Sequence, residues 1–188
     1  MIKTSFYSTE ELKEMEFKTI GKNVLISRKT SIYNSKNISL GDNVRIDDFS
    51  LLSGGKGIQI GSCVHIASFC ALYGGEGIKL EDFSGLSSRV VIYSNSDDYS
   101  GEFLTNPTIP EEFRQTFGGL VTLGKHVIVG TGTTILPNIT IGKGSSIAAM
   151  SLVNKSLGEW GIYAGIPVKF LKERKKNLIQ LEKKMLKN

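Results

Sequence analysis

An Ile, Leu or Val recurs at every sixth position through most of this 188-residue chain, and this repeat limits the possible folds more than any other feature. A fixed period of this kind is typical of solenoids, in which a repeat buries its apolar residue by stacking on its neighbours. The pattern predicts short strands joined by sharp turns, three strands to a coil and about six coils in all. The anchors are Ile20, Ile26, Ile32, Leu40, Ile46, Leu52, Ile60, Ile66, Leu72, Leu80, Leu86, Ile92, Leu123, Val129, Ile135, Ile141, Ile147 and Val153.

Two further features of the repeat concern its turns. Gly directly follows many anchors, as at Gly21, Gly41 and Gly61, where a backbone can turn without a Cβ clash. The first four groups of three anchors begin 20 residues apart, so two extra residues enter each coil at one corner. These insertions should stack into a ridge in which Glu76 pairs with Lys56 of the preceding coil.

The repeat divides the chain into a solenoid and two flanking segments. Ser8 and Glu11 have the spacing of a capping box, which predicts a short helix through Met15. The apolar stripe of Leu171, Leu178, Leu181 and Met185 predicts a C-terminal helix from Phe170 to Leu186. The expected organisation is an N-terminal helical cap (1–19), a repeat region (20–155) with an excursion loop (93–120), and a closing segment with the C-terminal helix (156–188).

Charge and composition narrow the class of protein. The net charge of +5 comes mainly from the Lys-rich segment 168–188, so the remainder offers no basic surface for nucleic acid, and no nucleic-acid partner is expected. The start of the chain lacks the apolar run of a signal peptide, and no stretch is long enough to span a membrane, so a cytoplasmic protein is expected. Cys63 and Cys70 lie within the repeat, where reduced structural thiols are expected.

Two motifs give the repeat a family resemblance. The segments Ile135-Leu-Pro-Asn-Ile-Thr-Ile-Gly142 and Tyr163-Ala-Gly-Ile-Pro-Val-Lys169 resemble the closing motifs of the hexapeptide-repeat acyltransferases. The resemblance implies an all-β, left-handed parallel β-helix, a homotrimer, and acyl-CoA (acetyl-CoA) as co-substrate in a groove between neighbouring solenoids, with no metal. It also implies that Ala148, Lys169 and Arg174 face the cofactor, although a plain coil position and two solvated basic side chains would explain the same residues.

The residue at the usual position of the general base distinguishes this chain within the family. Many members have a His after the strand that opens the loop, whereas the matching run Ile92-Tyr-Ser-Asn-Ser-Asp97 ends in Asp97. A carboxylate with a pKa near 4 is a poor base for a hydroxyl but can orient an amine or receive its proton. Asp97 as the catalytic residue therefore favours N-acylation, with the thioester carbonyl polarised by backbone N–H groups.

The polar run Ser94-Asn-Ser-Asp97-Asp98-Tyr-Ser-Gly101, with nearby Asp82 and Ser87, resembles one branch of the family, the acyltransferases of nucleotide-linked deoxyaminosugars. The resemblance implies an acceptor of that class, in surface polysaccharide synthesis, with Asp82, Ser87 and Asp98 beside it. Tyr93 and, on the ridge, Glu76 are further candidates for binding the acceptor. Solvent-facing repeat positions would also explain Asp82 and Ser87, and a loop turn would explain Asp97 and Asp98.

Three alternatives make different predictions. An O-acetyltransferase acting on a sugar, antibiotic or serine hydroxyl would need a histidine base, for which His126 is the candidate because His65 lies in a regular coil. A zinc carbonic anhydrase of similar fold is excluded, because it needs three His ligands and this chain has 2 His. A non-enzymatic solenoid would have a regular flat face in place of the long polar loop.

Overall fold

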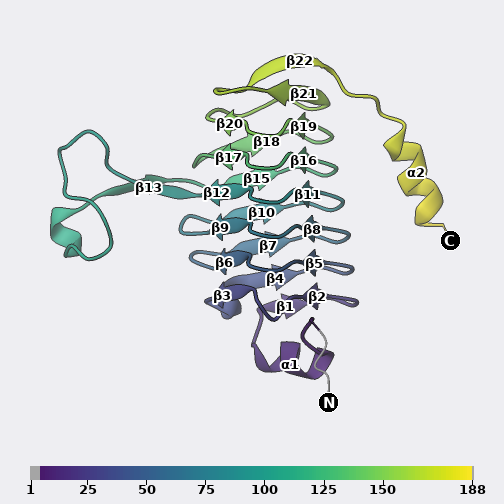
Figure 1. Cartoon of the computed structure of the whole chain (residues 1–188), viewed down its shortest axis with the longest axis horizontal. Helices are drawn as coiled ribbons and strands as arrows, with labels where there is room; N and C mark the ends of the chain where they lie inside the picture. The colour runs from purple at the N-terminus through teal and green to yellow at the C-terminus, as the bar shows by residue number, and fades with distance from the viewer. Residues whose placement is uncertain (1–4, 188) are drawn as a thin grey trace.

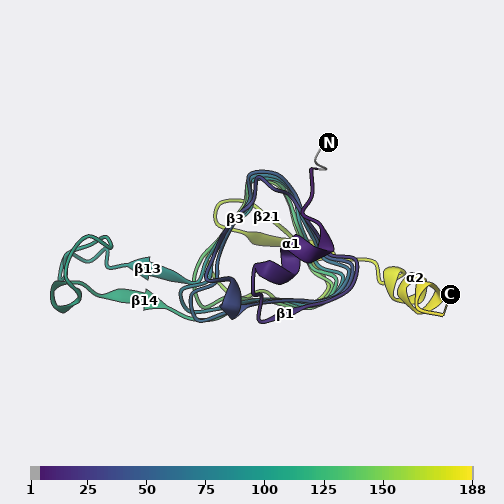
Figure 2. The ribbon, with the colours of Figure 1, turned by 90° about the horizontal axis from the view of Figure 1, so that it is seen from below.

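Residues 5–187 of the chain, described by a computed structural model, wind into a triangular prism with parallel strands on its three sides (Figures 1 and 2). Sheet 1 contains β1 (Thr19–Ile20), β4 (Ile38–Leu40), β7 (Ile58–Ile60), β10 (Ile78–Leu80), β15 (Val121–Leu123) and β18 (Thr140–Ile141). Sheet 2 contains β2 (Leu25–Ile26), β5 (Arg45–Ile46), β8 (His65–Ile66), β11 (Gly85–Leu86), β16 (Ile128–Val129), β19 (Ser146–Ile147), β21 (Gly161–Ala164) and β22 (Lys169–Glu173). Sheet 3 contains β3 (Ser31–Tyr33), β6 (Leu51–Ser53), β9 (Ala71–Tyr73), β12 (Val91–Tyr93), β17 (Thr134–Ile135) and β20 (Leu152–Val153).

The prediction of a parallel β-helix is confirmed, in keeping with the left-handed winding that the family resemblance implies. The coil count differs slightly, because β21 pairs in parallel with β19 and adds part of a seventh turn above the six expected. Strand β22 then runs antiparallel to β21 and closes the top of the prism. The C-terminal helix was predicted to begin at Phe170, but Phe170 and Leu171 belong to β22 and α2 covers only Leu178–Met185.

The sixth-position anchors form the core of the prism. Equivalent anchors of successive coils pair directly, as Leu80 does with Ile60 below it and Leu123 above it. All of them are buried except Ile20 and Ile32, which belong to the first coil and have a neighbouring coil on one side only. Burial of each anchor contributes about 1.5–3 kcal/mol, which explains why the six-residue period is kept so strictly.

The three corners of the prism are named here by the sheets they join. Corner 1–2 includes residues 81–84 and 124–127, corner 2–3 includes residues 87–90 and 130–133, and corner 3–1 includes residues 74–77. Gly41 on corner 1–2 is required by stacking: a Cβ there would lie 2.7 Å from the carbonyl carbon of Gly61 in the next coil. The paired turns can therefore approach closely only without side chains.

The two α-helices of residues 5–187 lie toward opposite ends of the chain. Helix α1 (Thr9–Glu14) has the predicted capping box between Ser8 and Glu11, and its Leu12 is buried against the first coil. Helix α2 lies beside the prism near corner 1–2 (Figures 1 and 2). Neither helix in residues 5–187 has the length and apolar character needed to cross a bilayer. The first four residues of the expected N-terminal cap, and Asn188, fall outside the described residues.

The excursion loop leaves the prism at corner 3–1, between β12 and β15. It forms a hairpin of β13 (Asn95–Asp97) and β14 (Thr116–Gly118), which projects away from the solenoid (Figure 2). A short 3₁₀ turn, Glu111–Phe113, lies near its outer end, and another, Ser35–Asn37, lies in the ridge of corner 3–1. Strand β15 still pairs with β10, so the excursion leaves the stacking of the coils intact.

Candidate active site

The base of the hairpin is fixed to the solenoid by the buried hydroxyl of Ser94. Its Oγ donates to the carbonyl oxygen of Tyr73 at 2.8 Å and accepts from the backbone N–H of Glu76 at 2.8 Å. The Glu76 carboxylate accepts from Lys56 Nζ at 2.6 Å, which confirms the predicted pair along the ridge. The rings of Tyr73 and Tyr93 stack with their centroids 5.1 Å apart. These contacts attach the base of the hairpin firmly to the solenoid.

Asp97 lies at the outer end of β13, opposite Thr116 of β14, and is half-buried. It lines a cavity of about 470 Å³ together with Tyr93, Asn95, Ser96, Tyr99, Pro107, Arg114, Thr116, Leu136 and Pro137. One carboxylate, one guanidinium and several apolar groups thus surround a space of the size that small ligands occupy. Tyr93 and Asp97, both predicted from the sequence, line this cavity together.

Asp98 is less suited than Asp97 to bind a ligand, because its carboxylate already accepts hydrogen bonds from the loop that follows it. Its oxygens accept from the backbone N–H groups of Ser100, Gly101, Glu102 and Phe103 at 2.9–3.2 Å, and from the Ser100 hydroxyl at 3.0 Å. The hydrogen bond from the Ser100 N–H is the main reason that the pKa of Asp98 is lowered. Asp98 therefore organises the turn at the start of the loop.

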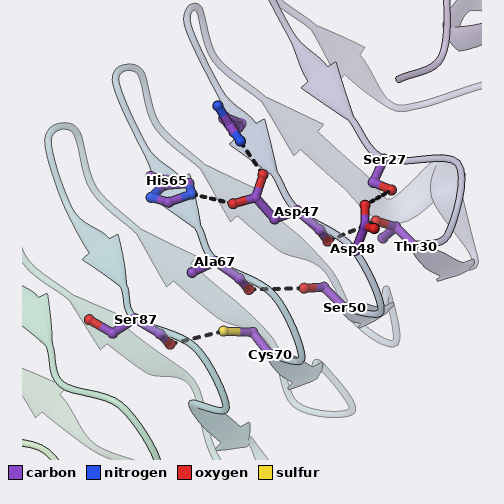
Figure 3. A network of polar contacts seen from close by, with 10 residues as sticks. Ser27, Thr30, Asp47, Asp48, Ser50, His65, Ala67, Cys70 and Ser87 are labelled. Carbon is purple, nitrogen blue, oxygen red and sulfur yellow. Dashed lines mark hydrogen bonds and ion pairs between the residues drawn. The ribbon is translucent and has the colours of Figure 1, made fainter. Parts of the chain in front are cut away.

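Ser87 lies on corner 2–3, where it lines a separate hollow of about 250 Å³ with His65, Gly85 and Thr131. Figure 3 shows the polar network beside it: Nε2 of His65 lies 2.8 Å from Oδ2 of Asp47, and Cys70 Sγ donates to the carbonyl oxygen of Ser87 at 3.2 Å. Burial alone would raise the pKa of Asp47, but hydrogen bonds from His65 and Arg45 outweigh it and lower that pKa.

Asp82 lies on corner 1–2, where its Oδ1 accepts from the Ser62 N–H at 2.8 Å. It lines a shallow cavity of about 560 Å³ on the outer face of sheet 1, together with Gln59, Lys79 and Lys125. Asp82, Ser87 and Asp97 thus lie on three different corners. A single chain does not bring them together.

His126, the alternative base, lies at corner 1–2 beneath the C-terminal segment. It is 8% exposed, its ring stacks on Phe83, and its Nε2 lies 2.8 Å from Oε2 of Glu182 in α2. Lys125 donates to the other oxygen of Glu182. His126 therefore helps to hold α2 against the prism. It lies on corner 1–2, whereas the hairpin that carries Asp97 leaves the prism at corner 3–1.

The three residues expected to face the cofactor have different environments. Arg174 Nη1 donates to the carbonyl oxygens of His126 at 2.8 Å and Gly144 at 2.9 Å, and burial lowers its pKa. The backbone N–H of Ala148 donates to Tyr163 within the coil stack, whereas Lys169 is exposed on β22. Of the three, Lys169 has the charged group that is most accessible to a ligand.

Sequence reasoning missed Arg114, Thr116 and Tyr99 in the Asp97 cavity. They lie in the excursion, which has no periodicity from which the direction of a side chain could be predicted. Within residues 5–187, no cluster of three or more His, Cys, Asp or Glu side chains has the geometry to hold a metal ion.

Comparison with known proteins gives consistent relatives, although no family model matches the chain. The chain is 43% identical over 173 residues to the dTDP-4-amino-4,6-dideoxy-D-glucose acyltransferase of Escherichia coli, covering 92% of this chain and 90% of that protein. It is 51% identical to AntD, an N-acyltransferase from Bacillus cereus solved with dTDP and 3-hydroxybutyryl-CoA, with a TM-score of 0.94 and 98% of each chain covered. A variant of AntD in complex with dTDP-4-amino-4,6-dideoxyglucose and coenzyme A matches with a TM-score of 0.95, at 50% identity over 99% of each chain. A hexapeptide-repeat acetyltransferase from Vibrio cholerae, at 19% identity and a TM-score of 0.60 over 89% of this chain and 80% of that one, shares the fold.

This chain belongs to the hexapeptide-repeat acyltransferases, in the branch of the dTDP-aminosugar N-acyltransferases. It is an acyl-CoA-dependent enzyme, and the prediction of N-acyl transfer to a nucleotide-linked deoxyaminosugar is confirmed at the level of the family.

Proposed function

We propose that this chain transfers an acyl group from acyl-CoA to the 4-amino group of dTDP-4-amino-4,6-dideoxyglucose. The observation that carries the proposal is the half-buried carboxylate of Asp97, in a cavity whose lining within the described chain contains no histidine. The apolar side of that cavity, with Tyr93, Leu136 and Pro137, suits the ring face and the methyl group of a 6-deoxy sugar. The full-length relatives named for this sugar, or solved with it, support the choice.

Asp97 is proposed to act on the acceptor amine. Its carboxylate attracts the ammonium form, orients the nitrogen, and accepts one proton as the free amine forms. The amine then bonds to the thioester carbonyl carbon and the carbon–sulfur bond breaks, so that an amide and the thiol of coenzyme A are the products. The second proton, which the nitrogen loses as the amide forms, balances the one that the thiolate gains. An amine needs less activation than a hydroxyl, which is consistent with a carboxylate in place of histidine.

Ser87 is proposed as a second contact with the acceptor. Solved variants of AntD replace one aspartate and one serine ten positions before it. Ser87 and Asp97 have this spacing, as do Ser88 and Asp98. The Asp98 carboxylate already accepts hydrogen bonds from its own loop, so Ser87 and Asp97 are the pair able to bind a substrate.

A trimer is part of the proposal, because the candidate residues lie on separate corners of one chain. The hairpin also exposes Phe103, Leu104, Phe113 and Phe117, with 38–57% of each side chain open to solvent. An isolated two-stranded hairpin is marginally stable in water, and apolar patches of this kind favour packing against a second chain. Docking of the hairpin near corner 2–3 of a neighbour would unite Asp97 with Ser87. Asp82 and Glu76 then remain acceptor contacts of lower weight, since both carboxylates have intramolecular partners.

Acyl-CoA is proposed to lie between neighbouring solenoids, with Lys169 beside its phosphates and the backbone around Ala148 along its pantetheine arm. The exposed position of Lys169 on β22 supports this role. Arg174 is proposed to act indirectly, by holding the C-terminal segment against corner 1–2. Acyl-CoA and nucleotide-linked sugars are cytoplasmic metabolites, which supports the cytoplasmic location.

The proposal is tested by thiol release from acetyl-CoA and from 3-hydroxybutyryl-CoA. The acceptors are dTDP-linked 4-amino and 3-amino sugars, with the matching hydroxyl sugars as controls. Turnover confined to amino sugars, and fastest with the 4-amino sugar, is the expected result. Turnover confined to hydroxyl sugars would refute N-acylation.

A further inference from the structure

The cavity that holds Asp97 also contains a cation whose hydrogen-bonding capacity is incompletely used. Within residues 5–187, the Nε of Arg114 is one of two buried side-chain polar atoms without a hydrogen-bond partner. Its Nη2 lies 3.6 Å from Oε1 of Glu111, beyond the range of a hydrogen bond, and the Glu111 side chain is 93% exposed. An exposed ion pair of this length contributes little to stability.

The hairpin geometry places Arg114 on the same side as Asp97. Thr116 is opposite Asp97 in the register, so their side chains share one face of the ribbon. Arg114 precedes Thr116 by two residues, has extended backbone angles (φ −128°, ψ 151°), and lines the same cavity. Side chains two residues apart along a strand are about 7 Å apart. Arg114 therefore lies on the same face of the hairpin as Thr116 and Asp97, two residues farther from the solenoid than Thr116.

This arrangement presents a negative and a positive group with a cavity beside them. The acceptor proposed above carries the complementary charges: an ammonium group at one end of its sugar ring and a diphosphate at the other. A partly buried guanidinium with an unused Nε–H donor is well suited to phosphate oxygens, which it can bind through two parallel hydrogen bonds. An unpaired buried donor is unfavourable until such a partner arrives.

We propose that Arg114 binds the diphosphate of the nucleotide-linked acceptor, while Asp97 binds its amino group. Resting on the proposed function, this inference adds a residue that selects nucleotide-linked over free aminosugars. The sugar ring then spans the cavity between the two side chains, with the nucleotide toward the outer end of the hairpin.

The test measures binding and turnover separately. Arg114→Met should weaken dTDP binding in calorimetry about 10- to 100-fold, the effect of losing a hydrogen bond to a charged group, and raise KM for the dTDP-aminosugar by a similar factor. KM for acetyl-CoA should stay unchanged. Asp97→Asn should leave dTDP binding intact but lower turnover. Arg114→Lys should retain part of the affinity, because it keeps the charge but loses the planar fork.

Two controls separate recognition from structure. Glu111→Gln removes the ion-pair partner of Arg114 and should leave dTDP affinity unchanged. Lys36→Met removes a cation from the ridge, far from the cavity, and should also leave dTDP affinity unchanged. Equal dTDP affinity in the wild type and in Arg114→Met would overturn the inference. A rise in KM for acetyl-CoA in place of the acceptor would also overturn it, by assigning Arg114 to the phosphates of coenzyme A. Loss of oligomeric state in Arg114→Met and Arg114→Lys alike, or a Glu111→Gln effect equal to that of Arg114→Met, would show a structural role and overturn it too. A wild-type protein that neither binds dTDP nor acylates the aminosugar would instead refute the proposed function.

Discussion

Nε2 of His126 lies 2.8 Å from the carboxylate of Glu182, a residue 56 positions later in the chain, and this contact joins the C-terminal helix to corner 1–2. The hydrogen bond from Lys125 is the first cause, and the bond with His126 a further one, of the lowered pKa of Glu182. A histidine engaged in this way holds the C-terminal helix, and we expect it to be separate from the chemistry proposed for Asp97.

His126→Ala should therefore release α2 and leave acyl transfer in place. We expect faster amide exchange in residues 178–185, measured by mass spectrometry, with kcat changed by less than the 100-fold typical of a lost general base. Because the pKa of Glu182 is lowered in the folded chain, its contribution is present above the ordinary pKa of a Glu and is lost as pH falls through the lowered value. The wild-type tail should thus loosen below about pH 4. Abolished turnover with a well-ordered tail would restore His126 as the base.

Asp97→Asn should reduce kcat/KM for the dTDP-aminosugar about 100-fold, within the range of groups that position or accept a proton. The asparagine keeps the shape but not the charge that attracts an ammonium group. Steady-state thiol release measures the effect. Glu112→Gln, a neutralised and exposed carboxylate in the same excursion, is the matched control and should retain full activity. Equal rates in the two variants would remove Asp97 from the mechanism.

Asp98→Ala should disorder the start of the excursion without unfolding the prism, because the four backbone N–H groups that it accepts all lie in residues 100–103. Amide exchange should accelerate there, while Tm shifts little, since the core contacts lie elsewhere. Since the pKa of Asp98 is lowered, this order should persist down to its ordinary pKa near 4 and be lost only as pH falls through the lowered value. Asp98→Asn keeps one acceptor oxygen and should give an intermediate result. A large drop in Tm for both variants would contradict this role.

Cys70 should resist alkylation in the native protein. Burial raises the pKa of its thiol to about 11, so at pH 8 only about one molecule in a thousand carries the reactive thiolate. Peptide mapping after iodoacetamide treatment at pH 8 should find Cys63, which is partly exposed, modified first. Both should react after unfolding in guanidinium. Rapid native labelling of Cys70 would mean that corner 2–3 opens readily.

The repeat made the fold predictable, because an apolar residue at every sixth position is buried only if the chain turns after each repeat and stacks coil upon coil. The position of an anchor in the series then gives its coil. The same logic identified the Lys56–Glu76 pair, which follows from stacking equivalent positions. It failed at the ends of the prism: Phe170 and Leu171 fit a helical stripe, but the open edge of β21 offers backbone hydrogen bonds that favour β22. The extra turn of β21 was missed for a similar reason, since Gly161–Ala164 does not follow the six-residue spacing.

The candidate site was predictable only where the sequence resembles a motif of the family. Asp97 was identified because it stands where many members have the general-base histidine, and Tyr93 lies in the same run. Arg114 and Thr116 could not be found, because their side-chain directions depend on the hairpin register and not on the period. Asp98 was grouped with the acceptor contacts because it lies in the run that resembles the aminosugar branch. In the structure Asp97 lines the cavity, whereas the Asp98 carboxylate accepts hydrogen bonds from backbone N–H groups of its own loop.

Strand β15 continues the stack on β10 as though the excursion were not there, so the hairpin is an insertion between two complete coils. Most of the residues that line the proposed acceptor cavity belong to this insertion, and Tyr93, Leu136 and Pro137 belong to the solenoid. Substitutions in the hairpin are therefore expected to change acceptor selectivity more than folding, and substitutions at the anchors are expected to change stability more than selectivity. A common scaffold for acyl transfer can thus acquire new acceptors by exchanging one hairpin.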